Sequence, residues 1–248
     1  MRKAICLLVK EPNKIWVDFL NTFTEYDIFI VVDDNSSTYE KMKEDLAANV
    51  RIIQVDNHKC YEKGYTNCNS AVGFPEVISW DKAMFIMNEV YTNYEHTWFI
   101  EDDVFLYHEK TLLNIDLQEQ YNCADLLTAT NDIMEEKDES KWQNWWNHWV
   151  NIHDKIELSW SHSMVCACRI SRVLLDKVVE YKNKRGHLFF IEAMFNTIAL
   201  QNHLVIKTPI ELSNIHWRTE WNRDEIDTTK LYHPIKNIMD HNYIREKG

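Results

Sequence analysis

The first 57 residues alternate between apolar runs and helical segments, and no other feature constrains the fold as much. The runs at residues 4–9, 28–32 and 51–55 read as buried strands. Residues 15–23 have apolar side chains at helical spacing, and Asn and Ser residues can cap a second helix at 39–48. Strands that alternate with helices form parallel sheets through right-handed crossovers. We therefore expect an α/β, Rossmann-like fold in which helices cover both faces of a central, mostly parallel sheet.

The rest of the chain continues this pattern less regularly. Residues 57–75 have no clear periodicity, and a loop of that length in a compact domain is usually functional. From residue 214 onward the sequence is polar and aromatic, which predicts an irregular segment on the surface. The other expected elements are helices at 76–91, 110–119, 171–181 and 189–200, and strands at 97–100, 124–130, 163–168 and 205–208. Since no repeat or linker divides the chain, we expect a single domain, residues 1–248.

Composition excludes several classes of function. The chain carries 27 basic and 39 acidic side chains, and its net charge of −12 repels phosphate backbones and anionic lipid. We therefore expect no nucleic acid partner. No stretch approaches a membrane span, and residues 1–10 are too short for a signal peptide, which predicts a soluble cytoplasmic protein. The six cysteines show no dense framework, so we expect reduced thiols, with a Cys60–Cys68 bridge as the alternative.

The apolar run at residues 97–100 ends in three consecutive acids, Glu101, Asp102 and Asp103. Carboxylates that leave a buried strand together repel one another unless a cation or hydrogen-bond donors hold them. Oxygen clusters of this kind bind hard divalent ions, and ligands of open α/β sheets bind at the carboxyl ends of strands. The pattern therefore indicates a metal site, and a solvated acidic turn is the alternative.

A strand that ends in Glu-Asp-Asp resembles the Asp-x-Asp motif of GT-A-fold glycosyltransferases. Glu101 and Asp103 occupy its first and third positions, and Glu at the first position is a variant that the family shows. The resemblance implies that Asp103, with Glu101, binds Mn²⁺ or Mg²⁺, which holds the diphosphate of a nucleotide sugar, with Asp102 beside it. It also implies a single GT-A domain with a nucleotide-binding half (1–105) and an acceptor-binding half (106–248).

Further residues match positions that bind the nucleotide in this family. Asp33 and Asp34 follow the second strand, where members place an acid that contacts the nucleoside, and a carboxylate accepts hydrogen bonds from ribose hydroxyls or a uracil N–H. Lys10, after the first strand, lies at the same edge. Lys82, in a segment similar to that of small soluble transferases, including those of large DNA viruses, could neutralise phosphate. The alternatives are helix capping for the acids and a plain surface position for the lysine.

Two residues of the second half carry the expected chemistry. Glu192 is the single acid in an apolar and aromatic context at a helix start, where burial raises a carboxyl pKa toward the range of a general base. Inverting GT-A enzymes have a similar acid, and a partly exposed Glu paired with the helix dipole is the alternative. His216 resembles the C-terminal histidine that many members fold back onto the metal.

Four tryptophans, Trp142, Trp145, Trp146 and Trp149, fall on one helical stripe within residues 135–155. Such a stripe predicts an aromatic face packed against the core. Indole faces can instead pack against the apolar C–H face of a sugar, so an acceptor site is the alternative.

Together these features predict a divalent-metal-dependent glycosyltransferase, inverting in mechanism, that moves a sugar from a UDP- or GDP-sugar to a glycan or glycoprotein acceptor. A sugar nucleotidyltransferase is one alternative, but it needs a Gly-rich loop after the first strand, and residues 10–13 contain no glycine. A non-catalytic sugar- or nucleotide-binding module of the same fold is the other. The sequence indicates no oligomeric state, and it does not distinguish inversion from retention.

Overall fold

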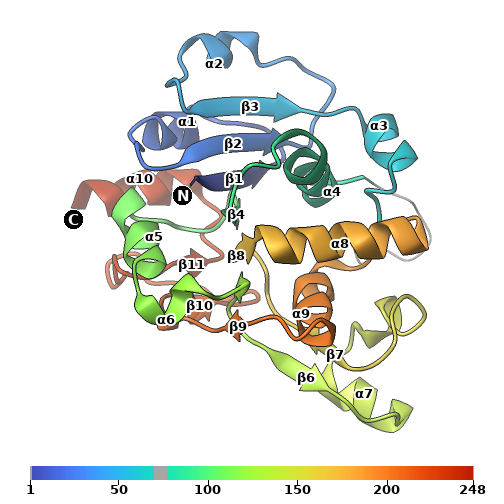
Figure 1. The fold of residues 1–248 in the computed structure, drawn as a ribbon. Helices are drawn as coiled ribbons and strands as arrows, with labels where there is room; N and C mark the ends of the chain where they lie inside the picture. The colour runs from blue at the N-terminus through green and yellow to red at the C-terminus, as the bar shows by residue number, and fades with distance from the viewer. Residues whose placement is uncertain (1, 70–76, 248) are drawn as a thin grey trace.

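A seven-stranded sheet lies at the centre of the computed structural model, which describes residues 2–69 and 77–247 (Figure 1). Its strands are β1 (Lys3–Val9), β2 (Asp27–Val32), β3 (Val50–Gln54), β4 (His96–Glu101), β5 (Leu126–Leu127), β8 (Ala167–Ser171) and β9 (Ile206–Lys207). Two small two-stranded sheets pair β6 (Asp132–Met134) with β7 (Trp160–His162), and β10 (Asn214–Ile215) with β11 (Tyr232–His233).

The central sheet has the order β3-β2-β1-β4-β8-β5-β9 and is mostly parallel. Only β8 runs antiparallel to its neighbours β4 and β5 within it. Leu8 of β1 lies opposite Val31 of β2 on one side and Glu101 of β4 on the other. The carboxyl ends of these three strands therefore meet at one edge of the sheet, and the expected fold class is confirmed.

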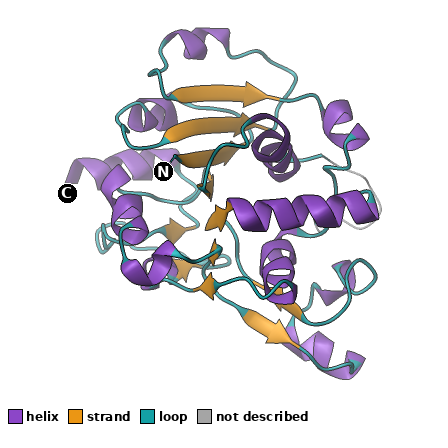
Figure 2. Ribbon diagram, viewed as in Figure 1, coloured by secondary structure: helices purple, strands orange, loops and turns teal. Residues whose placement is uncertain are grey.

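Helices cover both faces of this sheet (Figure 2). Strand β1 is buried from Ala4 to Val9, and alternate residues of this stretch contribute to two separate cores. One core also contains apolar side chains of α4, α8 and α9, and the other those of α1 and α5. The helices are α1 (Lys14–Leu20), α2 (Glu40–Glu44), α3 (Asn57–Glu62), α4 (Ser79–Phe85), α5 (Glu109–Asp116), α6 (Glu119–Asn122), α7 (Glu139–Trp145), α8 (Arg172–Arg185), α9 (Ile191–Gln201) and α10 (Ile238–Lys247).

Several expected boundaries are wrong. The helix expected at 39–48 is only the short α2, and α3 lies where a loop was expected. The helix expected at 76–91 begins at Ser79 and continues beyond α4 as a π-helical turn, Ile86–Val90. Residues 70–76, which belong to the expected loop and helix, lie outside the described residues. The strand expected at 163–168 is β8, which begins at Ala167, and residues 164–166 before it line a cavity described below.

The Trp-rich region does not form one helix. It contains α7 and then a 3₁₀ turn, Trp149–Asn151, because Trp146 has extended backbone and ends α7. Trp142 and Trp145 pack against Trp160 of β7, and both are partly buried. The stripe therefore borders the core, as expected, but through a bent segment.

The chain end also differs from the expectation of an irregular surface segment. It contains α10, which lies beside the N-terminal part of the fold in Figure 1. The Arg245 guanidinium lies 3.4 Å from the ring centroid of Phe19 in α1, and the His241 ring lies 5.5 Å from that of Trp16. Polar side chains make these contacts, which is why an apolar periodicity could not reveal the helix.

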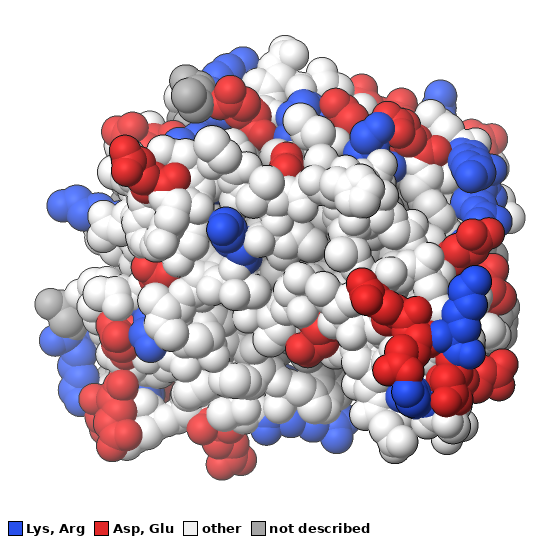
Figure 3. Space-filling view, turned by 60° about the horizontal axis from the view of Figure 1, so that its bottom comes forward, with Lys and Arg blue, Asp and Glu red and all other residues white. Residues whose placement is uncertain are grey.

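The surface agrees with the acidic composition. On the face shown in Figure 3, acidic and basic side chains alternate along the margin, and the middle is largely uncharged. None of the helices in the described part of the chain combines the length and apolar character needed to cross a bilayer.

Candidate active site

A cavity of about 340 Å³ lies where β4 leaves the sheet. Its walls come from the β4 end, α4, the segment before β8, the start of α9 and the C-terminal segment around β11. The residues with polar or aromatic side chains on these walls are Asn69, Trp80, Glu101, Asp103, Cys166, Phe190, Glu192, Trp217, Arg218, His233 and Lys236.

The backbone fixes how the three acids leave β4. The amide of Glu101 donates to the Cys166 carbonyl at 2.8 Å, and that of Asp102 donates to the Leu8 carbonyl at 3.1 Å. The chain then turns, because the Val104 amide donates to the Glu101 carbonyl at 3.0 Å. Asp103 thus sits in a tight turn at the end of a buried strand. Sequence and sheet together present its carboxylate and that of Glu101 to the cavity.

Trp80 and Cys166 lie beside Glu101. The Trp80 indole N–H donates to its Oε1 at 2.7 Å, and the Cys166 sulfur lies within 4.8 Å of a carboxylate oxygen on the same side chain. Burial raises the pKa of Glu101 and the nearby charge of Asp103 adds to this, while the Trp80 hydrogen bond opposes it. The same forces act on its neighbour, because burial and then the charges of Asp103 and Glu101 raise the pKa of Asp102 to about 6.

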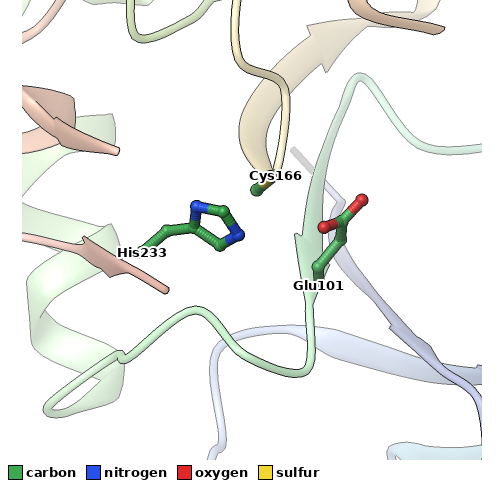
Figure 4. A group of neighbouring side chains, drawn as sticks. All are labelled: Glu101, Cys166 and His233. Carbon is green, nitrogen blue, oxygen red and sulfur yellow. The ribbon is translucent and has the colours of Figure 1, made fainter. Parts of the chain in front are cut away.

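His233 of β11 faces this cluster (Figure 4). Its Nδ1 lies 2.7 Å from the His216 carbonyl, which can only accept, so Nδ1 carries the proton. Its Nε2 is then directed to the Asp103 carboxylate, 3.3 Å away. Burial lowers the pKa of His233, but the hydrogen bond and charge of Asp103 outweigh this and the net pKa is raised. Orientation of a histidine through its second nitrogen is typical of metal ligands.

The arrangement fits a divalent cation. Glu101 and Asp103 line one end of the cavity, with Asp102 between them in the chain, and a positive ion there relieves their mutual repulsion. Asp103, Glu101 and His233 supply carboxylate oxygens and an imidazole nitrogen on the cavity wall. These donors suit Mn²⁺, and Mg²⁺ through the carboxylates.

Glu192, in the first turn of α9, lies on the same wall and is partly buried. Burial and then the charge of Glu101 raise its pKa to about 7, and His233 opposes the shift. Glu192 also lines an adjoining cavity of about 510 Å³ with Trp146, Phe190 and Trp217. A carboxyl that titrates near neutral pH therefore stands between two hollows, a position suited to proton transfer.

The acids after β2 lie outside this cavity and are satisfied by the chain itself. Lys82 is fully buried, not on the surface, and its Nζ lies 3.4 Å from Asp33 Oδ1 and donates to the Asp33 carbonyl. Asp34 accepts from the Ser36 amide at 2.8 Å and from the Tyr39 hydroxyl at 2.9 Å, and these hydrogen bonds lower its pKa. Lys10 is exposed and its carbonyl accepts from the Asp34 amide at 3.0 Å.

His216 does not reach the acid cluster in this structure. Its exposed ring lies 5.6 Å from that of Trp221, and only its backbone touches His233. His233, seventeen residues later, is the histidine whose ring lies 3.3 Å from the Asp103 carboxylate. The expectations from the sequence also missed Arg218 and Lys236, which lie in the segment from residue 214 onward that shows no core pattern, and they treated Cys166 only as a buried thiol in a strand. A His-Pro-Ile-Lys run at 233–236 was the signal for His233 and Lys236.

Comparisons with known proteins find a likeness in fold and none in sequence. No family model and no curated protein matches the sequence. Among solved structures, the chain is similar to the galactosyltransferase LgtC in complex with donor and acceptor sugar analogs (10% identity, TM-score 0.49, 99% of this chain and 95% of that chain). It is also similar to apo mouse xyloside xylosyltransferase 1 (10%, 0.45, 96% and 98%) and to 4-diphosphocytidyl-2C-methyl-D-erythritol synthase from Anaerococcus prevotii (8%, 0.46, 99% and 96%).

The first two of these proteins are glycosyltransferases of the GT-A fold, the class that the acid-ended strand resembles. At TM-scores below 0.5 and identities near 10%, the likeness carries no argument about activity. What this chain does must be argued from its own cavity, and the fold it uses is the mostly parallel α/β sheet expected from its sequence.

Proposed function

We propose that this chain is a metal-dependent glycosyltransferase that uses a nucleotide diphosphate sugar. One observation carries the proposal. A cluster of partly buried acids with His233 lines one end of the cavity, and Glu192, with a pKa of about 7, lines the same cavity. A metal-binding end and a base-bearing wall within one cavity are what sugar transfer from a diphosphate requires.

In this proposal Asp103, Glu101 and His233 hold Mn²⁺ or Mg²⁺. When bound, the ion supplies Lewis acid chemistry that stabilises the negative charge on the departing diphosphate. The protein fixes the ligands beforehand, since Trp80 orients Glu101 and the His216 carbonyl orients His233. Asp102 stays beside them, its carbonyl accepting a hydrogen bond from the Trp16 indole at 3.0 Å.

Two cations of the C-terminal segment are assigned to the diphosphate. Arg218 and Lys236 line the cavity, and both are exposed. Their presence is notable in a chain of net charge −12, because most of its surface repels a nucleotide. A guanidinium and an ammonium beside the metal ligands offer charge-assisted hydrogen bonds to phosphate oxygens.

The nucleoside is assigned to the ends of β1 and β2, in the half of the chain formed by residues 1–105. Strand β1 separates β2 from β4, and neighbouring strands are about 4.8 Å apart, so the two acidic ends are roughly 10 Å apart. That separation suits a nucleoside whose diphosphate reaches the β4 end. Asp33, Asp34 and Lys10 are the candidate contacts, and Lys82 acts through Asp33, because its side chain is fully buried.

Glu192 is the proposed base of an inverting reaction. Its carboxylate takes the proton of an acceptor hydroxyl while that oxygen forms a bond to the anomeric carbon of the donor sugar. The bond from this carbon to the diphosphate oxygen breaks, and its electrons leave with the nucleoside diphosphate. A retaining course remains the alternative for the same donor.

The acceptor is assigned to the adjoining cavity, in the half of the chain formed by residues 106–248. Of the four tryptophans of the Trp-rich region, only Trp146 lines it among the described residues, and its ring stacks on Phe190 at 5.6 Å with an interplanar angle of 6°. Trp217, which is 64% exposed, lies on the wall shared by both cavities. Aromatic surfaces next to a base suit a glycan, free or attached to a protein.

A screen of UDP- and GDP-sugars for hydrolysis and transfer, with Mn²⁺ or with a chelator, tests this function. We expect turnover of one donor that depends on the metal. Asp176→Asn, at an exposed position of α8 remote from the described cavity residues, is the matched control and should behave as the parent protein. Nucleotide binding without turnover of any donor would leave a binding module, and pyrophosphate release from a sugar phosphate and a nucleoside triphosphate would identify a nucleotidyltransferase.

A further inference from the structure

The thiol of Cys166 has no part in the mechanism above, although it lies within the cluster. Cys166 directly precedes β8, is 6% exposed and lines the cavity. Its sulfur lies within 4.8 Å of a carboxylate oxygen of Glu101, a residue assigned to the metal. All six cysteines are free, and Cys123 is the exposed one.

Cys166 completes a second set of potential metal ligands. A carboxylate oxygen of Glu101, a ring nitrogen of His233 and the Cys166 sulfur all lie within 4.8 Å of one another. Figure 4 shows that they come from three separate parts of the fold, the end of β4, the start of β8 and β11. In tetrahedral zinc sites, ligand atoms lie about 3.3–3.6 Å apart, given metal–ligand bonds of about 2.0–2.3 Å. Small side-chain rotations therefore bring this set to the required geometry.

Two hydrogen bonds prepare the set. The His216 carbonyl fixes the proton of His233 on Nδ1, which leaves Nε2 for a metal, and the Trp80 indole holds one oxygen of Glu101. Outer contacts of this kind orient ligands and raise metal affinity. The remaining wall near Cys166 includes Met164, Val165 and Ile191, so the sulfur is shielded from bulk water.

The chemistry of the donors selects the metal. Thiolate, imidazole and carboxylate together are a zinc ligand set, whereas Mg²⁺ and Mn²⁺ prefer oxygen. We propose that Glu101, Cys166 and His233 form a Zn²⁺ site that shares two ligands with the site for the catalytic metal. On binding, zinc replaces the thiol proton, which goes to solvent, and a Zn–S bond forms.

Because Glu101 and His233 serve both sites, the two metals exclude each other. Zinc binding requires only these three side chains. Its consequence, reversible inhibition of sugar transfer, rests on the proposed function. Asp103 separates the two, since it is paired with His233 but is not a member of the thiol-containing set.

Cobalt(II) titration of the metal-free protein tests the zinc site directly. We expect a sulfur-to-cobalt charge-transfer band in the near ultraviolet that disappears when zinc displaces the cobalt. Cys166→Ser and Cys166→Ala should lose the band and bind zinc about 100-fold more weakly or worse, since even outer-shell changes cost 10–100-fold. Cys123→Ser, which alters the exposed thiol, is the matched control and should keep the band.

A parent protein without the band, or a folded Cys166→Ser variant that keeps it, overturns the proposal. If both Cys166 variants fail to fold, the parent protein and Cys123→Ser still decide, because a band lost with Cys123 assigns the sulfur elsewhere. Asp103→Asn distinguishes the two proposals. It should keep the cobalt band while losing Mn²⁺-dependent nucleotide binding.

Discussion

Acidic residues follow both β2 and β4, but the side chains around the two groups of acids differ. After β2, the chain supplies its own partners, with Lys82 beside Asp33 and with Ser36 and Tyr39 donating to Asp34. After β4, three partly buried acids gather beside His233, and burial raises the pKa values of Glu101 and Asp102. The comparison teaches that the acidic motif alone does not mark a ligand site. What marks it is a group of acids that crowd one another at a cavity, because a bound cation can then relieve their repulsion.

The largest difference should appear on removing one acid from the β4 cluster. Asp103→Ala should abolish metal-dependent nucleotide binding, since it removes a metal ligand and the partner of His233. It should leave the protein folded, because it also relieves repulsion among the acids. Calorimetry with and without Mn²⁺, alongside a melting curve, measures both effects, with Asp176→Ala on α8 as the control. Unchanged affinity would place the metal elsewhere.

The base should matter for rate and not for donor binding. Glu192→Gln keeps the shape of the side chain but cannot take a proton, so transfer should slow by about 10²–10⁴-fold. Nucleotide affinity should stay within the error of the parent value, because Glu192 is assigned to the acceptor side. Transfer rate and nucleotide affinity are measured on the same preparation. Near-normal turnover would remove Glu192 from the mechanism and favour the retaining alternative.

Removing a partner of the acids after β2 should lower the stability of the folded protein. Lys82→Met removes the fully buried cation and leaves Asp33 and the backbone carbonyls near it unpaired. We expect a loss of about 2 kcal/mol in the free energy of unfolding, the scale for losing hydrogen bonds to a charged group, because the Asp33 side chain is 34% exposed and stays hydrated. Urea denaturation of the variant measures it. Lys177→Met, on the surface of α8 beside Glu180, should change stability little, and an equal loss there would contradict the assignment.

The raised pKa of Glu192 predicts a pH dependence with a definite sign. Burial raises this pKa to about 7 from an ordinary 4.5, so the folded protein holds the proton more tightly than the unfolded chain. The resulting stability is fully present below pH 4.5 and is lost as the pH rises through 7. Between these limits the parent protein should lose up to about 3 kcal/mol relative to Glu192→Gln. Denaturation of both proteins across this range checks it, and parallel stability curves would contradict burial of the carboxyl.

The smallest effect is expected for the nucleoside contacts. Asp33→Asn should weaken nucleotide binding by about 1–3 kcal/mol, the usual cost of losing a hydrogen bond to a charged group. Asp34→Asn should weaken it less, since both oxygens of Asp34 already have partners in the chain. Calorimetry at saturating Mn²⁺ measures both. If affinity holds and only stability falls, the two acids act as structural partners and the contrast between β2 and β4 becomes complete.

The sequence by itself determined the sheet and the place of the metal candidates. Buried strands such as β1 leave continuous apolar runs, and alternation with helices allows few topologies. The same logic put Glu101 and Asp103 at the carboxyl end of a central strand, because the acids directly follow the apolar run. A single acid among aromatic residues likewise drew attention to Glu192, a partly buried carboxyl whose pKa is raised.

Only the tertiary structure decided which distant residues complete the site. His233, and not His216, lies at the acid cluster because β10 pairs with β11. This pairing places the backbone carbonyl of His216 where it accepts a hydrogen bond from the ring of His233. Lys82 became a buried partner of Asp33 because α4 packs over β1 and β2, and Cys166 reached Glu101 because β8 runs antiparallel to β4. These contacts join residues that are far apart in the sequence. They therefore produce no periodic pattern from which they could be predicted.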